Sequence, residues 1–318
     1  MKLLKCSGYL LYTVVVVFFL LWYKFPADAF KARIEKDLNM MTPTLQWGVK
    51  KISLVPPFNV QLRHISITGK KEQERLLEVQ SVNLIPDPIT WKQTGNIAGK
   101  YRLNLLNGTV TGHLALTKDR SALEYDGTVQ DVQIDNKEPA FIQQDYQRTL
   151  HGTLSGNFSG TRKLKKKHQS LQGQFTFAKG ELSLQQPVLG MKQIDFDRIE
   201  TQLAFSSGTI SLSQGKVNSP LFAADFQGSL HTTVPCSLSR IDLKGFFRPR
   251  AEFASSIDSP SLVMLLKKEM QQGNLPFTVN GLLKAPGIKF TSLPPTFNNQ
   301  MGLIRKQLRQ MPQGGPAK

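Results

Sequence analysis

The feature that most constrains this chain is a two-residue periodicity of apolar side chains between residues 45 and 290. Leu45, Trp47 and Val49 alternate with polar residues near the start, and Phe277 and Val279 do so near the end. Successive side chains of a β-strand point to opposite faces, so this alternation predicts strands with one apolar and one polar face. We identify about 14–16 such stretches separated by short turn segments, which predicts a mainly β, antiparallel domain.

A sheet of that many strands cannot stay flat. At ~4.8 Å per strand it would extend about 70 Å, so it must coil, fold over or split. We therefore expect an elongated, curved sheet that forms either an open groove or a folded-over sandwich. Glycines recur in the apolar phase, most clearly within residues 150–160. They leave room on the inner face for sharp curvature or for a molecule lying against the backbone.

Local signals refine the strand pattern. A phase slip at Arg63-His64 predicts a β-bulge, because the apolar residues change face there. Asn107-Gly108 predicts a two-residue hairpin turn, and Lys179-Gly180 predicts another turn. Short helices are predicted over residues 89–94, 139–148 and 260–270.

The N-terminal region carries one long apolar segment. Cys6–Tyr23 runs for 18 residues without a charge, which is long enough to cross a bilayer as a helix. Trp22 and Tyr23 at its end are typical of a membrane interface. We predict a short cytoplasmic tail and a transmembrane helix within residues 1–24. A cleaved signal peptide is the alternative, because Ala27-Asp28-Ala29 has the small-x-small form of a cleavage site.

Three further segments complete the predicted organisation. Residues 25–42 are expected to form an amphipathic connecting helix with Phe30, Ile34 and Leu38 on one face. Residues 43–293 form the β-rich domain, and residues 294–318 form a short basic helix and a disordered Gly/Pro-rich tail. Lysine and arginine are more frequent after the apolar segment than before it, which favours a cytoplasmic domain. Long domains are exported largely regardless of charge, so we expect the tail inside and the domain outside.

The charge balance bears on partners. The formal net charge is +17 and the isoelectric point is about 9.9, which favours anionic partners. An exported domain meets little nucleic acid, so phospholipid or lipopolysaccharide head groups are the expected anions. The alternative is that the charge only maintains solubility. With Cys6 and Cys236 as its two cysteines, the chain has no disulfide framework.

Two candidate binding sites follow from the pattern. The first is an apolar groove, for which the alternative is an ordinary core; it comprises Leu150, Leu154, Phe158, Leu171, Phe175 and Phe177. The second is an anion contact, for which the alternative is a solvated loop tip; it comprises Arg162, Lys163, Lys165, Lys166 and Lys167. The five histidines are scattered and show no metal-ligand spacing. No catalytic, metal or cofactor motif is present, so we expect a non-enzymatic protein.

Several short motifs resemble those of a known family. They are the apolar segment leading into residues 25–30, the segment Ile52–Phe58 with the strand through residues 62–67, and Gly281–Phe290 near the end. Together they resemble the type II secretion system protein N family. The glycine-spaced strands and the closing Gly-Leu-Leu-x-x-Pro segment are also similar to AsmA-type envelope proteins.

The resemblance implies a function and a location. It implies a bacterial inner-membrane protein that crosses the membrane once and carries a periplasmic β-rich domain. Its partners would be other secretion-system or envelope proteins, and its role would be non-enzymatic participation in type II protein secretion. The AsmA-like character implies an alternative, periplasmic lipid binding or lipid transfer. The resemblance supplies no catalytic residues.

Overall fold

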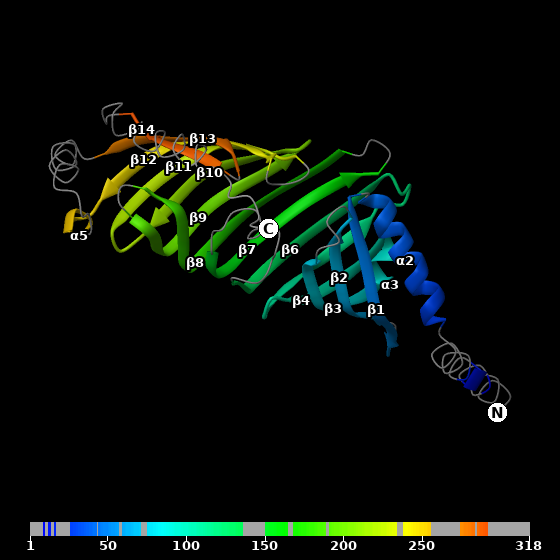
Figure 1. Cartoon of the computed structure of the whole chain (residues 1–318). Helices are drawn as coiled ribbons and strands as arrows, with labels where there is room; N and C mark the ends of the chain where they lie inside the picture. Colours follow the sequence, from blue (N-terminus) through cyan, green and yellow to red (C-terminus); the bar gives the residue numbers. More distant parts are fainter. Residues whose placement is uncertain are drawn as a thin grey trace, which may run out of the picture. The chain divides into compact units, whose positions relative to one another are not determined.

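The computed structural model describes most of the β-rich region. It covers residues 26–42, 44–56, 59–70, 75–135, 150–164, 168–188, 191–233, 238–255, 274–283 and 285–291, together with Tyr9, Tyr12, Thr13 and Val16. The chain divides into two compact units, Met1–Arg120 and Ser121–Lys318. Fourteen strands lie in the order of the chain, five in the first unit and nine in the second (Figure 1). The pairings within each unit are antiparallel, so the prediction of a mainly β, antiparallel fold is confirmed.

From Pro26 onward, the described residues of the first unit form two helices and five strands. They are α2 (Ala27–Met41), β1 (Leu45–Val55), β2 (Asn59–Gly69), β3 (Arg75–Asp87), α3 (Pro88–Thr94), β4 (Ile97–Leu105) and β5 (Gly108–Leu116). The buried core of this unit comprises Val49, Ile52, Leu62, Ile65 and Val79. Ile34 of α2 packs against this core, so the predicted amphipathic helix exists and contacts the sheet.

Side chains of α2 cover the outer edge of β1. The backbone N–H of Trp47 donates to Asn39 Oδ1 at 2.8 Å, and the N–H of Val49 donates to Glu35 Oε1 at 2.7 Å. Residues four apart on a helix and two apart on a strand have nearly the same spacing, about 6 Å, so the two pairs match. An edge strand with free N–H groups is prone to pair with other chains. The helix therefore protects this edge.

Two local predictions in the first unit need correction. His64 of β2 has a positive φ of 52°, and the apolar residues of β2 change face at this point. The apolar residues of β1 change face opposite it, so the register between β1 and β2 does not shift. The feature is a shared kink and lacks the extra residue of a bulge. The β4–β5 hairpin is confirmed, but its two loop residues are Leu106 and Asn107, both with positive φ, and Gly108 already begins β5.

In the second unit, the described residues form nine strands and one short helix. They are β6 (Ala122–Ile134), β7 (Leu150–Lys163), β8 (His168–Val188), β9 (Met191–Ser206), β10 (Thr209–Asn218), β11 (Phe222–His231), β12 (Arg240–Pro249), α5 (Ala251–Ser255), β13 (Leu275–Leu282) and β14 (Ala285–Phe290). Extensive packing between the described strands occurs between hydrogen-bonded neighbours. The described strands therefore form an open sheet and do not fold over into a sandwich.

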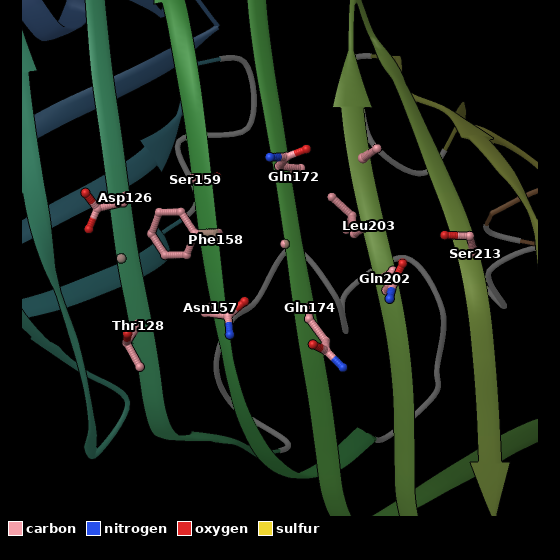
Figure 2. A pocket seen from close by; sticks show the side chains of 13 residues that line it. Asp126, Thr128, Asn157, Phe158, Ser159, Gln172, Gln174, Gln202, Leu203 and Ser213 are labelled. Carbon is pink, nitrogen blue, oxygen red and sulfur yellow. The ribbon is translucent and has the colours of Figure 1, made fainter.

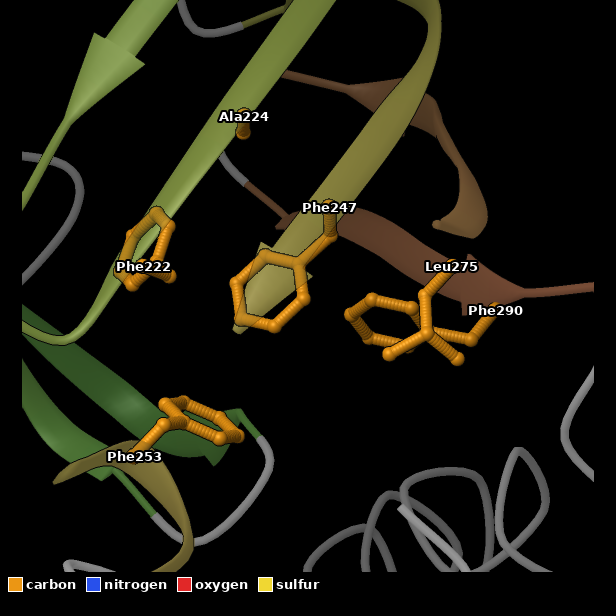
Figure 3. Packing of buried hydrophobic residues seen from close by; sticks show 6 residues of the cluster. All are labelled: Phe222, Ala224, Phe247, Phe253, Leu275 and Phe290. Atoms are coloured by element: carbon orange, nitrogen blue, oxygen red, sulfur yellow. The ribbon is translucent and has the colours of Figure 1, made fainter. Parts of the chain in front are cut away.

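The second unit contains a buried aromatic cluster at one end of the strands, and Val129, Val132 and Phe196 are buried outside this cluster. Phe222, Phe247 and Phe290 extend from β11, β12 and β14, and Phe253 of α5 packs against Phe247 with ring centroids 5.2 Å apart (Figure 3). Ala224 and Leu275 complete the cluster. Helix α5 was not predicted from the sequence. It closes this end because Phe253 is fully buried.

The predicted turn at Lys179-Gly180 is wrong. Strand β8 continues through this point, and Gly180 pairs with Phe196 of β9. Lys179 has a positive φ of 51°, which reverses the face on which the following side chains lie without reversing the chain direction.

Several predicted features lie outside the described residues. They are most of residues 1–24, the segments 139–148 and 260–270, Lys165–Lys167, Cys236 and residues 294–318. Within the described part of the chain, no helix is both long and apolar enough to cross a membrane. The predicted helix at residues 89–94 is confirmed as α3, which Asp87 caps and which ends at Gly95 in the left-handed conformation.

Candidate functional site: an apolar sheet face in the second unit

The register of β6 to β9 places the apolar phase of four strands on one face. Four cross-strand rows result, in which large side chains and glycines mostly alternate. The rows are Tyr125–Gly160–Leu171–Phe205, Gly127–Phe158–Gly173–Leu203, Val129–Gly156–Phe175–Thr201 and Val132–Leu154–Phe177–Ile199. We call this surface the apolar face.

The structure brings the predicted groove residues together on the apolar face. Leu154, Phe158, Leu171, Phe175 and Phe177 occupy its rows, and Leu150 follows in the same strand beyond a register shift at Gly152. All six side chains are half-buried. Tyr125, Leu203 and Phe205 belong to the same face but were not predicted as site residues. Alternation in their own segments was visible, but only the register joins those segments to β7 and β8.

The space above the glycines is occupied by aromatic rings. A Cβ added to Gly156 would lie 2.8 Å from Phe175 Cδ1, and a Cβ added to Gly173 would lie 2.8 Å from Phe175 Cε2. Likewise, a Cβ on Gly160 would lie 2.6 Å from the Tyr125 hydroxyl oxygen. The glycines therefore let rings from neighbouring strands lie down on the sheet. The apolar face is shallow, without an open channel along the glycine backbone.

The two ends of the apolar face differ in chemistry. At one end, Leu182 pairs with Ile194, which packs against the aromatic cluster of Figure 3. At the other end, Arg162 lies in the row beyond Tyr125, between Leu123 and Gln169, and is half-buried. The face thus runs from a closed aromatic end to an end that carries a guanidinium group.

Of the other predicted anion contacts, only Lys163 is among the described residues. Lys163 is in the opposite phase and is exposed, and Lys165–Lys167 lie outside the described residues. Of the two members of the predicted set that the structure describes, Arg162 is the one placed where it could contact an anion bound at the apolar face.

The opposite phase of the same strands forms a polar face with an open pocket of about 580 Å³. Its lining is mostly polar and includes Asp126, Asn157, Gln174 and Gln202, together with the apolar residues Phe158 and Leu203 (Figure 2). Gln202 Nε2 donates to Gln214 Oε1 at 2.8 Å, so the amides also pair with each other. No lysine or arginine is among the residues that line this pocket, so it offers hydrogen bonds to a neutral polar molecule and is poorly suited to an anion.

The described residues do not gather three or more histidine, cysteine, aspartate or glutamate side chains closely enough to hold a metal ion. The features that can be assigned chemistry are therefore the apolar face, the Arg162 end and the amide-rich polar face. Together they define an open antiparallel sheet with two chemically different faces. No family model, curated protein or solved structure matches the chain. The family resemblance stays a prediction.

Proposed function

We propose that the second unit binds the acyl chains of lipids along its apolar face. The observation that supports this proposal is the contrast between the two faces of β6 to β9. One face carries rows of apolar side chains, most of them half-buried and with Val129 and Val132 buried, and no described strand is packed across it. The other face carries amides and hydroxyls, many of them exposed. Extended apolar surface of this kind in a soluble domain indicates a binding surface.

The dimensions of the apolar face suit an acyl chain. From Arg162 to Leu154 the strand advances eight residues, about 26 Å at ~3.3 Å per residue. The hydrocarbon of one bilayer leaflet is about 15 Å thick, half of the ~30 Å core. A chain lying parallel to the strands would therefore fit within the length of the face. Burying ten methylenes would contribute about 8 kcal/mol before the cost of ordering the chain is subtracted.

Arg162 would set the orientation of the bound lipid. Its guanidinium group can form a two-fold hydrogen bond with a phosphate head group at the end of the face. The acyl chain would then extend toward the closed aromatic end. Because Arg162 is half-buried, added salt should weaken this contact less than it weakens a fully exposed one.

Photocrosslinking tests this proposal on the full chain. We would incubate the protein with a phospholipid that carries a photoreactive group in its acyl chain, irradiate, and map the modified peptides. The proposal expects crosslinks in β7 and β8 that are lost in Phe175→Asp and in Leu154→Asp. Gln174→Asp is the matched control, because it introduces the same charge at the neighbouring position of β8, on the polar face. Crosslinks confined to residues 6–23, or equal losses in Phe175→Asp and Gln174→Asp, would contradict acyl binding.

The association with type II secretion stays a prediction that rests on the resemblance alone. We propose that the chain is anchored in the bacterial inner membrane with its β-rich region in the periplasm, beside the secretion machinery. Deleting the gene should then impair export of secreted enzymes. Normal export with a leaky outer membrane would favour lipid transport without a role in secretion.

A further inference from the structure

One end of the first unit exposes a concentration of large apolar side chains. Ile89 is 67% exposed, Trp91 62%, Ile97 49%, Ile85 42% and Val55 39%. We call these five residues the tip. Isolated exposed apolar residues are common, but a group that includes a tryptophan indicates a surface that binds something.

The strand register places the tip residues at one end of the sheet. Val55 pairs with Asn59 at the β1–β2 turn, and the next pair along β2 joins Val60 to Leu84, the neighbour of Ile85 in β3. Helix α3, which carries Ile89 and Trp91, connects β3 to β4 at this same end and buries none of its residues. Ile97 begins β4 directly after α3. The tip therefore projects from the ends of four strands.

Positive charge surrounds the tip. Lys92 lies on α3, and Lys100 pairs across strands with Ile85. The side chain of Lys118 lies against Gly95 at the end of α3, and its backbone N–H donates to Asn96 Oδ1 at 3.0 Å. All three lysines are exposed.

The acidic groups near the tip are engaged in local hydrogen bonds. Asp87 accepts from the Thr90 hydroxyl and from two backbone N–H groups as the cap of α3, and Asp119 accepts from Thr117. Three lysines and two carboxylates thus lie near the tip, a small excess of positive charge, and the tip combines apolar side chains, an exposed tryptophan and cations. This composition is complementary to the surface of an anionic bilayer.

The direction of α2 places its N-terminal end near the tip. Glu35 contacts Val49 and Asn39 contacts Trp47, so α2 runs antiparallel to β1. Its first residue, Ala27, is eight residues before Glu35, about 12 Å along the helix. That distance corresponds to about four strand residues beyond Val49, close to the end of β1 at the tip. Ala27, the first residue of α2, thus lies near the tip end of the unit.

We propose that the tip is a membrane-docking surface that inserts Ile89 and Trp91 into the interface of an anionic bilayer, with Lys92, Lys100 and Lys118 against the head groups. The docking would orient the first unit with its α3 end on the membrane, beside the point where the N-terminal apolar segment joins α2. This inference concerns the first unit and holds or fails independently of acyl binding by the second.

Tryptophan depth measurements test the proposal on the full chain. Trp22→Phe with Trp47→Phe leaves Trp91 as the sole tryptophan, and Trp22→Phe with Trp91→Phe leaves Trp47 as a matched control. Trp47 lies eight residues from Val55, about 26 Å along β1, and its indole N–H donates to Thr42. Each variant would be reconstituted in vesicles of phosphatidylcholine with phosphatidylglycerol, in which part of the phosphatidylcholine is brominated near the head group. Far-UV circular dichroism would establish that each variant is folded.

We expect the bromines to quench Trp91 emission about twofold or more, and the emission maximum of Trp91 to move to shorter wavelength. The emission of Trp47 should change little. Ile89→Asp and the triple change Lys92→Glu, Lys100→Glu, Lys118→Glu should each reduce Trp91 quenching. Both alter exposed side chains, so neither should unfold the unit. Unquenched Trp91 emission would overturn the proposal and favour a protein partner for the tip. Equal quenching of Trp91 and Trp47 would also overturn it, because the whole unit would then approach the bilayer without a defined docking end.

Discussion

Replacing Gly180 with alanine should destabilise the second unit, because the new methyl group collides with a buried ring. A Cβ at this position would lie 2.0 Å from both Cε2 and Cζ of Phe196. Carbon atoms normally approach no closer than about 3.5 Å, so the ring would have to retreat by about 1.5 Å. Phe196 is only 4% exposed and packs against Phe177 with ring centroids 5.5 Å apart, which leaves little room for that movement.

The expected size of this effect follows from two opposing contributions. Overpacking a core by one methyl group costs about 1–3 kcal/mol. Removing a glycine restricts the unfolded chain and returns about 0.4–1 kcal/mol. We therefore expect Gly180→Ala to lower the free energy of unfolding by about 1–2 kcal/mol. Gly287→Ala is the control, because the nearest atom to its Cβ would be Asn280 O at 3.4 Å. It should be neutral or slightly stabilising.

Urea unfolding of the full chain in a mild detergent measures this difference. Far-UV circular dichroism follows the strands, and tryptophan fluorescence follows the first unit, because Trp22, Trp47 and Trp91 all belong to it. In a Phe196→Leu background, Cε2 and Cζ are absent, so Gly180→Ala should lower the free energy of unfolding only slightly. The effects of the Gly180 and Phe196 substitutions should therefore be strongly non-additive. A wild-type midpoint for Gly180→Ala, or an equal penalty in both backgrounds, would refute the proposed packing of the ring on the glycine.

Three further outcomes are expected. The hydrogen bonds from the Thr90 hydroxyl and from the Thr90 and Ile89 N–H groups hold the pKa of Asp87 below its ordinary value. The stabilisation of α3 by the Asp87 carboxylate is therefore fully present at pH values above the ordinary pKa. It is lost as the pH falls through the lowered pKa of the folded protein. Trp91 fluorescence should report this acid transition, and Asp87→Asn should abolish it. Glu35→Ala leaves the Val49 N–H without its acceptor and should lower the free energy of unfolding by about 1–3 kcal/mol. Hydrogen exchange at Val49 should also become faster. Arg33→Ala breaks an exposed ion pair with Asp37 and should lower the free energy of unfolding by about 0.5 kcal/mol or less. Phe222→Ala in the aromatic cluster should cost about 3–5 kcal/mol, whereas Phe175→Ala on the apolar face should cost clearly less in the same unfolding experiment.

The alternation of apolar residues predicted the strands well because strand geometry has a fixed period of two. It predicted antiparallel pairing and the six groove residues on one face. It failed at Lys179-Gly180 because a positive φ in mid-strand produces the same local sequence as a turn. The difference between the two is the packing of Phe196 on Gly180, a contact between strands that the order of residues alone does not contain.

The candidate sites were predictable only in part for a similar reason. Leu203, Phe205 and Tyr125 lie in strands whose alternation was visible, but assigning them to the groove requires the register of β6 to β9. Arg162 appeared in the sequence as one of several basic residues in a loop. The register separates it from Lys163 and places it on the apolar face. The exposure of Ile89 and Trp91 was also not predictable from the sequence, because a short helix with two large apolar residues is more often packed against a core.

Half-burial of the six groove residues distinguishes them physically from a core. Full burial of a large apolar side chain contributes about 1.5–3 kcal/mol, and a side chain that stays partly exposed forgoes part of that contribution. The six groove residues are all half-buried, whereas Phe222, Phe247 and Phe290 in the same unit are buried. The unit therefore forgoes stabilisation at these six positions, although the aromatic cluster shows that its chain can bury such residues completely. Natural proteins depart from good packing in this way mainly at functional sites. An acyl chain on the apolar face would complete the burial that the strands themselves leave unfinished.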